Sequence, residues 1–195
     1  MARMSTPAST HGNSLFERFT DLSPARDRLD DLVTPVAAAV RDWEGPVSAA
    51  DVLYTETDPA VADTAAFVEH YGDDLLAASA NCVIVAAKRG GETTFAACVV
   101  PSAARADVNG VVRRQLGARK VSFAPMDTAV GLTGMEYGGI TPIGLPADWP
   151  LLVDASLLEW EQVLIGSGRR TGKLVVPGSA FAQLPGVVVL TGLAA

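Results

Sequence analysis

Hydrophobic residues in the first quarter of the chain follow a helical spacing. From Ser23 onward they recur at intervals of three and four residues as far as Trp43. Ser23 is a suitable N-cap, and Gly45-Pro46 ends the segment. Pro35 is expected to kink or split the helix, because proline lacks the N–H that the preceding turn would bond. This amphipathic helix would pack on the rest of the chain or against a partner.

Beyond this helix, short apolar runs alternate with helical periods. Two apolar runs, 81–87 and 93–100, are joined by Lys88-Arg-Gly-Gly-Glu92, which indicates a β-hairpin. Hairpins mixed with helices favour an α+β fold with flanking helices around a curled, mixed and partly barrel-like sheet. The other expected elements are an extended segment at 47–58, helices at 58–71, from 107 and at 126–132, and strands at 120–124, 151–154, 162–166, 173–176 and 187–190.

Composition places the chain among globular proteins. Hydrophobic residues make up 49% of its 195 residues and charged residues 19%, so it can bury a sizeable core. We expect a mobile N-terminus at 1–22, a helical extension at 23–46 and a main domain at 47–195. The net charge of −7 argues against a protein that coats nucleic acid, although a local basic patch remains compatible with it.

Membrane and metal signatures are absent from the sequence. No run approaches the roughly 18 apolar residues of a membrane span, and the first 20 residues lack a signal-peptide core, so a cytoplasmic protein is expected. Cys82 and Cys98 lie in strand-like runs and are expected to be small buried hydrophobes. Without zinc-binding motifs, a complete phosphate loop or a serine-hydrolase elbow, no metal or cofactor is predicted.

The segment from Leu132 to Pro146 combines glycines and prolines at high density. Glycine allows close approach of the backbone to a ligand, and proline stiffens its neighbours. Such a rigid, bent loop can present backbone N–H groups to an anion or a polarised carbonyl. A purely structural turn is the alternative interpretation.

Three segments resemble one protein family. The run Gly138-Gly-Ile-Thr-Pro-Ile-Gly144 resembles the Gly-Gly-Val-Ser-Pro-hydrophobic-Gly signature of the YbaK/ProX-type aminoacyl-tRNA editing domains, also called prolyl-tRNA synthetase-associated domains. Leu151-Leu-Val-Asp154 is similar to the family's apolar strand ending in Asp, and Val163-Leu-Ile-Gly-Ser-Gly-Arg-Arg170 to its strand and following basic turn. The resemblance covers about residues 47–192 and implies the same α+β fold.

The resemblance implies hydrolysis of an amino-acid ester at the 3′ end of tRNA without a metal. It also implies help from the substrate's own ribose hydroxyl in place of a protein base. A small mischarged amino acid such as alanine, cysteine or serine would suit a pocket of small residues. The site expected from these motifs has backbone donors at Gly138, Gly139, Ile140 and Thr141 next to Pro142, a second wall at Gly166, Ser167 and Gly168, and an aromatic neighbour at Tyr54.

One departure from the family pattern affects the expected chemistry. The family usually has a Lys at the start of the first hairpin strand, where this chain has Ala80 or Asn81, depending on register. Asn81 can donate and accept hydrogen bonds but carries no ammonium. Lys173, where the family often has an acid, could supply the cation from elsewhere. The alternative is a non-catalytic module on the same fold that binds an aminoacyl-RNA end, a small amino-acid-like ligand or a protein.

Two basic clusters could contact RNA phosphates. Arg169 and Arg170 follow the pocket turn, and we expect them to hold the acceptor end of the tRNA. Solvated surface charge is the simpler interpretation of the other cluster, which consists of Arg113, Arg114, Arg119 and Lys120. DNA and membranes are not expected partners, and the oligomeric state, a homodimer included, stays open.

Overall fold

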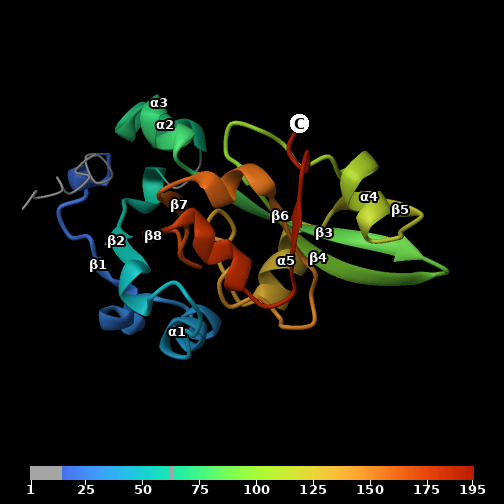
Figure 1. Cartoon of the computed structure of the whole chain (residues 1–195), viewed down its shortest axis with the longest axis horizontal. Coiled ribbons are helices and arrows are strands. Elements are labelled where there is room, and N and C mark those ends of the chain that lie inside the picture. The colour runs from blue at the N-terminus through green and yellow to red at the C-terminus, as the bar shows by residue number, and fades with distance from the viewer. Residues whose placement is uncertain (1–14, 62–63) are drawn as a thin grey trace, which may run out of the picture.

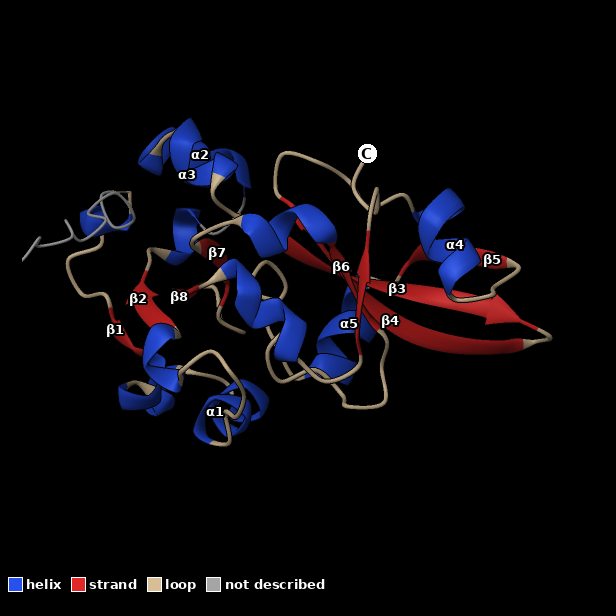
Figure 2. Cartoon of the chain, in the orientation of Figure 1, coloured by secondary structure: helices blue, strands red, loops and turns tan. Residues whose placement is uncertain are grey.

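The computed structural model of the protein describes residues 15–61 and 64–195 and has the expected α+β class (Figure 1). Its strands form two sheets (Figure 2), and no barrel closes among these residues. The smaller sheet has the order β1-β2-β8-β7, with β1 at Ser23–Pro24, β2 at Leu53–Glu56, β8 at Gly172–Val176 and β7 at Val163–Gly166. The larger has the order β5-β3-β4-β6-β9, with β5 at Lys120–Phe123, β3 at Ala80–Arg89, β4 at Glu92–Pro101, β6 at Leu151–Asp154 and β9 at Val187–Leu190.

The predicted hairpin is confirmed and forms the centre of the larger sheet. β3 and β4 pair over their whole length, and the turn consists of Gly90 and Gly91 alone. Both glycines have positive φ, +60° and +89°, which a two-residue hairpin turn of this kind requires. β6 adds to β4 in parallel, and β9 adds to β6 in parallel.

The two sheets meet at the beginning of β3. Ser79 forms an isolated parallel bridge with Leu164 of β7, and the Leu164 N–H donates to the Ala78 carbonyl at 2.9 Å. This single bridge does not continue as a ladder, so a wedge remains between β7 and the adjacent part of β3.

Helices lie mostly as predicted in the second half of the chain. α5, at Met126–Thr133, precedes the glycine-rich loop, and Asp107 caps the helical turns of Val108–Val112 and α4, at Arg113–Gln115, through the N–H groups of Gly110 and Val111. The segment predicted as one helix at 58–71 contains a 3-10 helix at Pro59–Val61 and α2 at Thr64–Tyr71, and α3, at Asp73–Ala77, was not predicted.

The continuous helix predicted from Ser23 is wrong in its first part. Ser23 pairs with Tyr54 in β1–β2, and the Ala25 N–H donates to the Val52 carbonyl at 2.8 Å. The α-helix, α1, begins only at Thr34 and ends at Arg41, with Pro35 in its first turn. Proline suits that position because the N–H it lacks would have no helical partner there.

Three groups of buried side chains stabilise the fold. The largest lies between the sheets and α1 and includes Val36, Ile143 and Leu174. A second covers the other face of the larger sheet under the helical turns of 108–115. In the third, Phe16 and Phe19, from the segment assigned to the N-terminus, pack with Phe67 of α2. The predicted mobile N-terminus at 1–22 lies outside the described residues for 1–14, and its described part is packed through the buried Phe16 and Phe19.

Candidate functional site

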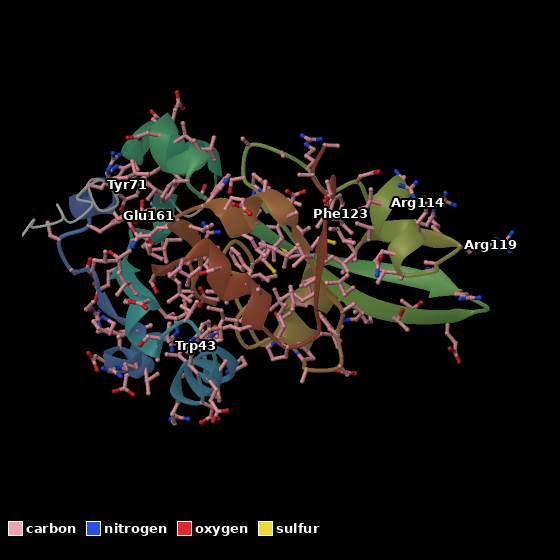
Figure 3. The ribbon with its side chains drawn as sticks, viewed as in Figure 1. Trp43, Tyr71, Arg114, Arg119, Phe123 and Glu161 are labelled. Carbon is pink, nitrogen blue, oxygen red and sulfur yellow. The ribbon has the colours of Figure 1, made fainter. Side chains whose placement is uncertain are left out.

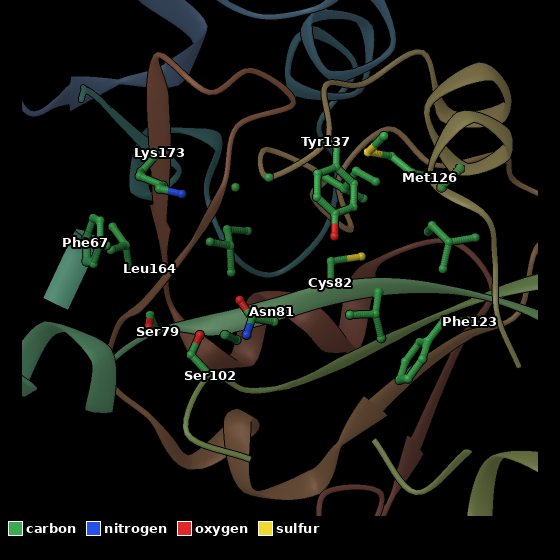
Figure 4. A pocket seen from close by; sticks show the side chains of 18 of the residues that line it. Phe67, Ser79, Asn81, Cys82, Ser102, Phe123, Met126, Tyr137, Leu164 and Lys173 are labelled. Atoms are coloured by element: carbon green, nitrogen blue, oxygen red, sulfur yellow. The ribbon is translucent and has the colours of Figure 1, made fainter. Parts of the chain in front are cut away.

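A cavity of about 540 Å³ opens where the two sheets diverge. Its walls come from the beginning of β3, the end of β5, α5, the glycine-rich loop and the β7–β8 pair (Figure 4). The volume lies within the range of ligand-binding pockets in proteins. The wedge between β3 and β7 thus produces the site, because neither sheet fills it.

Five of the predicted site residues line this cavity. Asn81 lies on the β3 side, Gly138 and Ile140 come from the glycine-rich loop, and Gly166 and Lys173 face it from β7 and β8. These residues are separated by up to 92 positions in the sequence (81 to 173) and are brought together only by the fold.

The other predicted site residues lie behind the cavity wall. Thr141, Pro142, Ser167 and Gly168 are buried, and Pro142 borders a second cavity of about 360 Å³ near α1. Tyr54 is also buried, only 1% exposed, with the Arg28 guanidinium 4.9 Å from its ring centroid. Burial raises the pKa of the Tyr54 phenol to about 12, so it stays neutral. These buried residues pack behind the residues that line the cavity.

The glycine-rich loop and the turn after β7 pack backbone against backbone. The Gly168 N–H donates to the Gly139 carbonyl at 2.7 Å, and the Glu136 N–H donates to the Gly168 carbonyl at 2.8 Å. A Cβ on Gly139 would lie 2.5 Å from the carbonyl oxygen of Arg169, and one on Gly166 would overlap the carbonyl oxygens of the loop. Glycine is therefore required on both sides of this contact.

Two of the four predicted backbone donors have partners within the loop. The Gly139 N–H donates to the Glu136 carbonyl at 2.9 Å, and the Thr141 N–H points to the Met135 sulfur at 3.4 Å. The N–H groups of Gly138 and Ile140 donate to no other described residue, and both residues line the cavity. These two amides are available to a ligand.

The edge of β3 offers further backbone groups. β5 pairs with β3 only at 85–88, so residues 81–83 have no strand neighbour on that side within the described chain. The Ile84 carbonyl accepts from the Ala124 N–H on this edge, and alternate residues of a strand direct their peptide groups to the same edge. The N–H and C=O of Cys82 therefore face the cavity.

Lys173 provides the positive charge of the cavity. Its side chain extends toward the cavity (Figure 4), and its ammonium lies 5.6 Å from the ring centroid of Phe67. No Asp or Glu of the described residues lies within 4 Å of it. Burial, reinforced by the charge of Arg170, lowers the pKa of Lys173 to about 8. The ammonium is thus mostly charged at neutral pH and free to receive a ligand oxygen.

The two arginines after the pocket turn bond to the protein itself. The Arg169 guanidinium donates to the Leu32 carbonyl at 3.3 Å. The Arg170 guanidinium donates to the carbonyls of Tyr137 at 3.4 Å and Pro59 at 3.1 Å. Both side chains therefore use some of their guanidinium N–H groups to hold the turn after β7 against neighbouring segments.

Several residues of the cavity were not anticipated from the sequence. Cys82, expected to be buried, is partly exposed and lines the cavity (Figure 4), whereas Cys98 is buried as expected. Desolvation raises the pKa of the Cys82 thiol, which keeps it protonated. Phe123, Met126 and Tyr137 are 54%, 52% and 58% exposed and border the opening. Tyr137, directly before Gly138 in the glycine-rich loop, was the available signal in the sequence.

Two kinds of feature are absent from the described residues. Within residues 15–61 and 64–195, no helix is long and apolar enough to cross a membrane. The same residues contain no group of three or more His, Cys, Asp or Glu side chains placed to hold a metal ion.

Comparisons with known proteins agree with the geometry. The chain is similar to a crystal structure described as a candidate trans-editing enzyme for prolyl-tRNA synthetase, with a TM-score of 0.65, 18% identity, and coverage of 80% of this chain and 93% of the other. It is also similar to the hypothetical protein APE2540, with a TM-score of 0.59, 24% identity, and coverage of 72% and 89%. The model of the family described as "Aminoacyl-tRNA editing domain" matches residues 58–184, which is more than half of the chain. The protein therefore belongs to the aminoacyl-tRNA editing domain family.

Proposed function

We propose that the protein is a trans-acting, metal-independent aminoacyl-tRNA deacylase that removes a small mischarged amino acid from tRNA. The observation that carries the proposal is the cavity itself. It combines unpaired N–H groups of Gly138 and Ile140 with an ammonium, that of Lys173, which has no acid within 4 Å among the described residues. Donors of this kind stabilise the negative charge that develops on an ester carbonyl during hydrolysis.

The reaction is an ordinary ester hydrolysis. A water molecule attacks the carbonyl carbon, the bond between this carbon and the ribose oxygen breaks, and the proton from water goes to the ribose oxygen. The products are the free amino acid and a tRNA with an intact terminal hydroxyl. The neighbouring ribose hydroxyl orients the water, since no His, Asp or Glu of the described residues lines the cavity to act as a base.

The walls of the cavity favour a small amino acid. Ala80, Ala129, Gly138 and Gly166 contribute small surfaces. A methyl group is about the size of a water molecule, which occupies roughly 30 Å³ of liquid. The cavity of about 540 Å³ is much larger than a small amino-acid side chain, so it also has room for the terminal nucleoside. Each extra methylene changes selectivity by only about 1–3 kcal/mol, so discrimination by size alone is modest.

Lys173 takes the place of the lysine that the family carries at the start of β3. Ala80 and Asn81 both line the cavity at that point, and neither carries a charge. The ammonium of Lys173 enters from β8, on the opposite wall, and holds an oxygen of the ester or of the ribose. Asn81, whose amide has no hydrogen-bond partner in the described part of the chain, assists by hydrogen bonding.

The decisive experiment mixes excess protein with tRNAs charged with alanine, serine, cysteine or proline. We expect rapid loss of one small amino acid, with the same rate in the presence of a chelator. The variant Lys173→Met should lose this activity, whereas the control change Arg26→Met, which removes an exposed cation outside the cavity, should retain it. Binding of charged tRNA without turnover would instead favour the non-catalytic module, and a rate abolished by chelation would overturn metal independence.

A further inference from the structure

Six exposed basic side chains gather at the end of the molecule that carries the hairpin tip. Arg114 and Arg119 lie at this end (Figure 3), and the pairing of β3 with β5 brings Lys88 and Lys120 together there. We call this group the hairpin-end cluster; it consists of Lys88, Arg89, Arg113, Arg114, Arg119 and Lys120. The protein as a whole has a net charge of −7, so a concentration of positive charge at one end calls for a physical reason.

The charges of this cluster are not neutralised by ion pairs. Among residues 15–61 and 64–195, every salt bridge within 4 Å involves Arg18 or Arg28, which lie at the other end of the fold. Glu92, the register partner of Arg89, forms no salt bridge with it, and Asp107 already accepts two backbone N–H groups.

The strand register forces part of this repulsion. Lys88 of β3 lies directly opposite Lys120 of β5, and the Arg119 N–H donates to the Lys88 carbonyl at 2.9 Å. Like charges directly opposite each other on neighbouring strands destabilise a sheet. A bound polyanion would relieve this repulsion, which is the arrangement expected where phosphates bind.

β5 connects the cluster to the cavity. The strand begins at Lys120 and ends at Phe123, which borders the cavity opening. Three residues of a strand span about 10 Å, so the cluster lies within the width of a nucleic-acid helix from the opening. Arg169 and Arg170, for which phosphate contacts are predicted, already donate some of their N–H groups to protein carbonyls.

We propose that the hairpin-end cluster binds the phosphate backbone of the tRNA acceptor stem while the 3′ end enters the cavity. This inference rests on the proposed function, because it takes the ligand of the cavity to be an aminoacylated RNA end. The cluster contributes affinity and orientation without reading sequence, since phosphate contacts carry no sequence information. It acts on substrate binding and not on the bond that breaks.

The test compares the double variant R114Q/R119Q with the matched control R26Q/R41Q, which removes two exposed charges from the N-terminal extension. For full-length charged tRNA we expect R114Q/R119Q to raise KM at least about tenfold at low salt, with kcat unchanged. The slope of log KM against log salt should decrease by about 1.5, because each contact to a phosphate contributes about 0.7 to 0.9. A short aminoacyl-adenosine substrate, which cannot reach the cluster, should be hydrolysed equally by all three proteins.

The outcomes separate this inference from the proposed function. If both variants bind and hydrolyse tRNA equally, the cluster is not the RNA surface, whereas the proposed function stands. If no protein hydrolyses either substrate, but R114Q/R119Q alone loses binding of unacylated tRNA, the proposed function fails and the RNA surface stands. Retention of anionic lipid vesicles or polyglutamate in preference to tRNA would overturn the inference.

Discussion

Replacing Lys173 by Met is expected to stabilise the protein at neutral pH while removing its turnover. Burial, together with the charge of Arg170, lowers the pKa of the Lys173 side chain to about 8 from the ordinary 10.5. A cation whose pKa is lower in the folded than in the unfolded protein destabilises the folded state wherever it remains protonated. This destabilisation is fully present below about pH 8 and disappears as the pH approaches 10.5.

The two pKa values set the size of the effect. A shift of one unit in pKa corresponds to about 1.4 kcal/mol. The difference between 10.5 and about 8 therefore lowers the free energy of unfolding by about 3 kcal/mol at pH 7. The ammonium recovers up to about 1 kcal/mol from the ring of Phe67, 5.6 Å away. Met keeps most of the aliphatic chain, so the free energy of unfolding should increase by about 2 kcal/mol, or about 4–8 °C in Tm.

Urea unfolding of the wild type and of Lys173→Met at pH 7 and pH 10 provides the assay. The advantage of the variant should shrink by about 2 kcal/mol between the two pH values, because the wild-type lysine loses its charge in the folded state first. Arg26→Met, at an exposed position without a salt bridge, should change stability little at either pH. A variant that is less stable at pH 7, or equally favoured at both pH values, would refute a desolvated charge in the cavity.

Three further perturbations test other parts of the site. Gly166→Ala should abolish turnover and lower the urea midpoint, since its Cβ would overlap loop carbonyls. Gly131→Ala, with open space around it in α5, should keep turnover and raise the urea midpoint, because alanine favours a helix over glycine. Tyr137→Ala, at a position that is 58% exposed, should raise KM more than it lowers kcat in steady-state kinetics. Asp154→Asn should cost about 1–2 kcal/mol at pH 7 through weaker hydrogen bonds. Burial acts to raise the pKa of Asp154, but three hydrogen bonds lower it below its ordinary value. The contribution of Asp154 to the free energy of unfolding should therefore fade as the pH falls through that lowered value.

Local signals in the sequence predicted the elements well. The pair Gly90-Gly91 between two apolar runs determines the hairpin, because only a two-residue turn with positive φ joins the strands there. Asp107 predicts its helix start for a similar reason, since its side chain accepts the first free N–H groups. Such features depend on neighbours within a few residues, which a single sequence displays.

Features that depend on distant partners were not visible in the sequence. The helical spacing after Ser23 gives no indication that this residue pairs with Tyr54, and the strand pairing displaces the helix from that position. Arg169 looks like a free cation in the sequence, yet its guanidinium reaches the Leu32 carbonyl, 137 residues away. The division into two sheets is of the same kind, since it arises from which strands pair and not from what any strand contains.

Strand pairing also explains how a cation on β8 can serve the cavity in place of one at the start of β3. Lys173 and Gly166 are register partners on β8 and β7, and both line the cavity. Because Gly166 has no side chain, the backbone carbonyls of Gly139 and Ile140 pack directly against it. This glycine therefore holds the glycine-rich loop, with its two free amides, beside the strand pair that carries the ammonium. The chemistry we propose requires a cation at the ester, and this geometry supplies it although the start of β3 carries none.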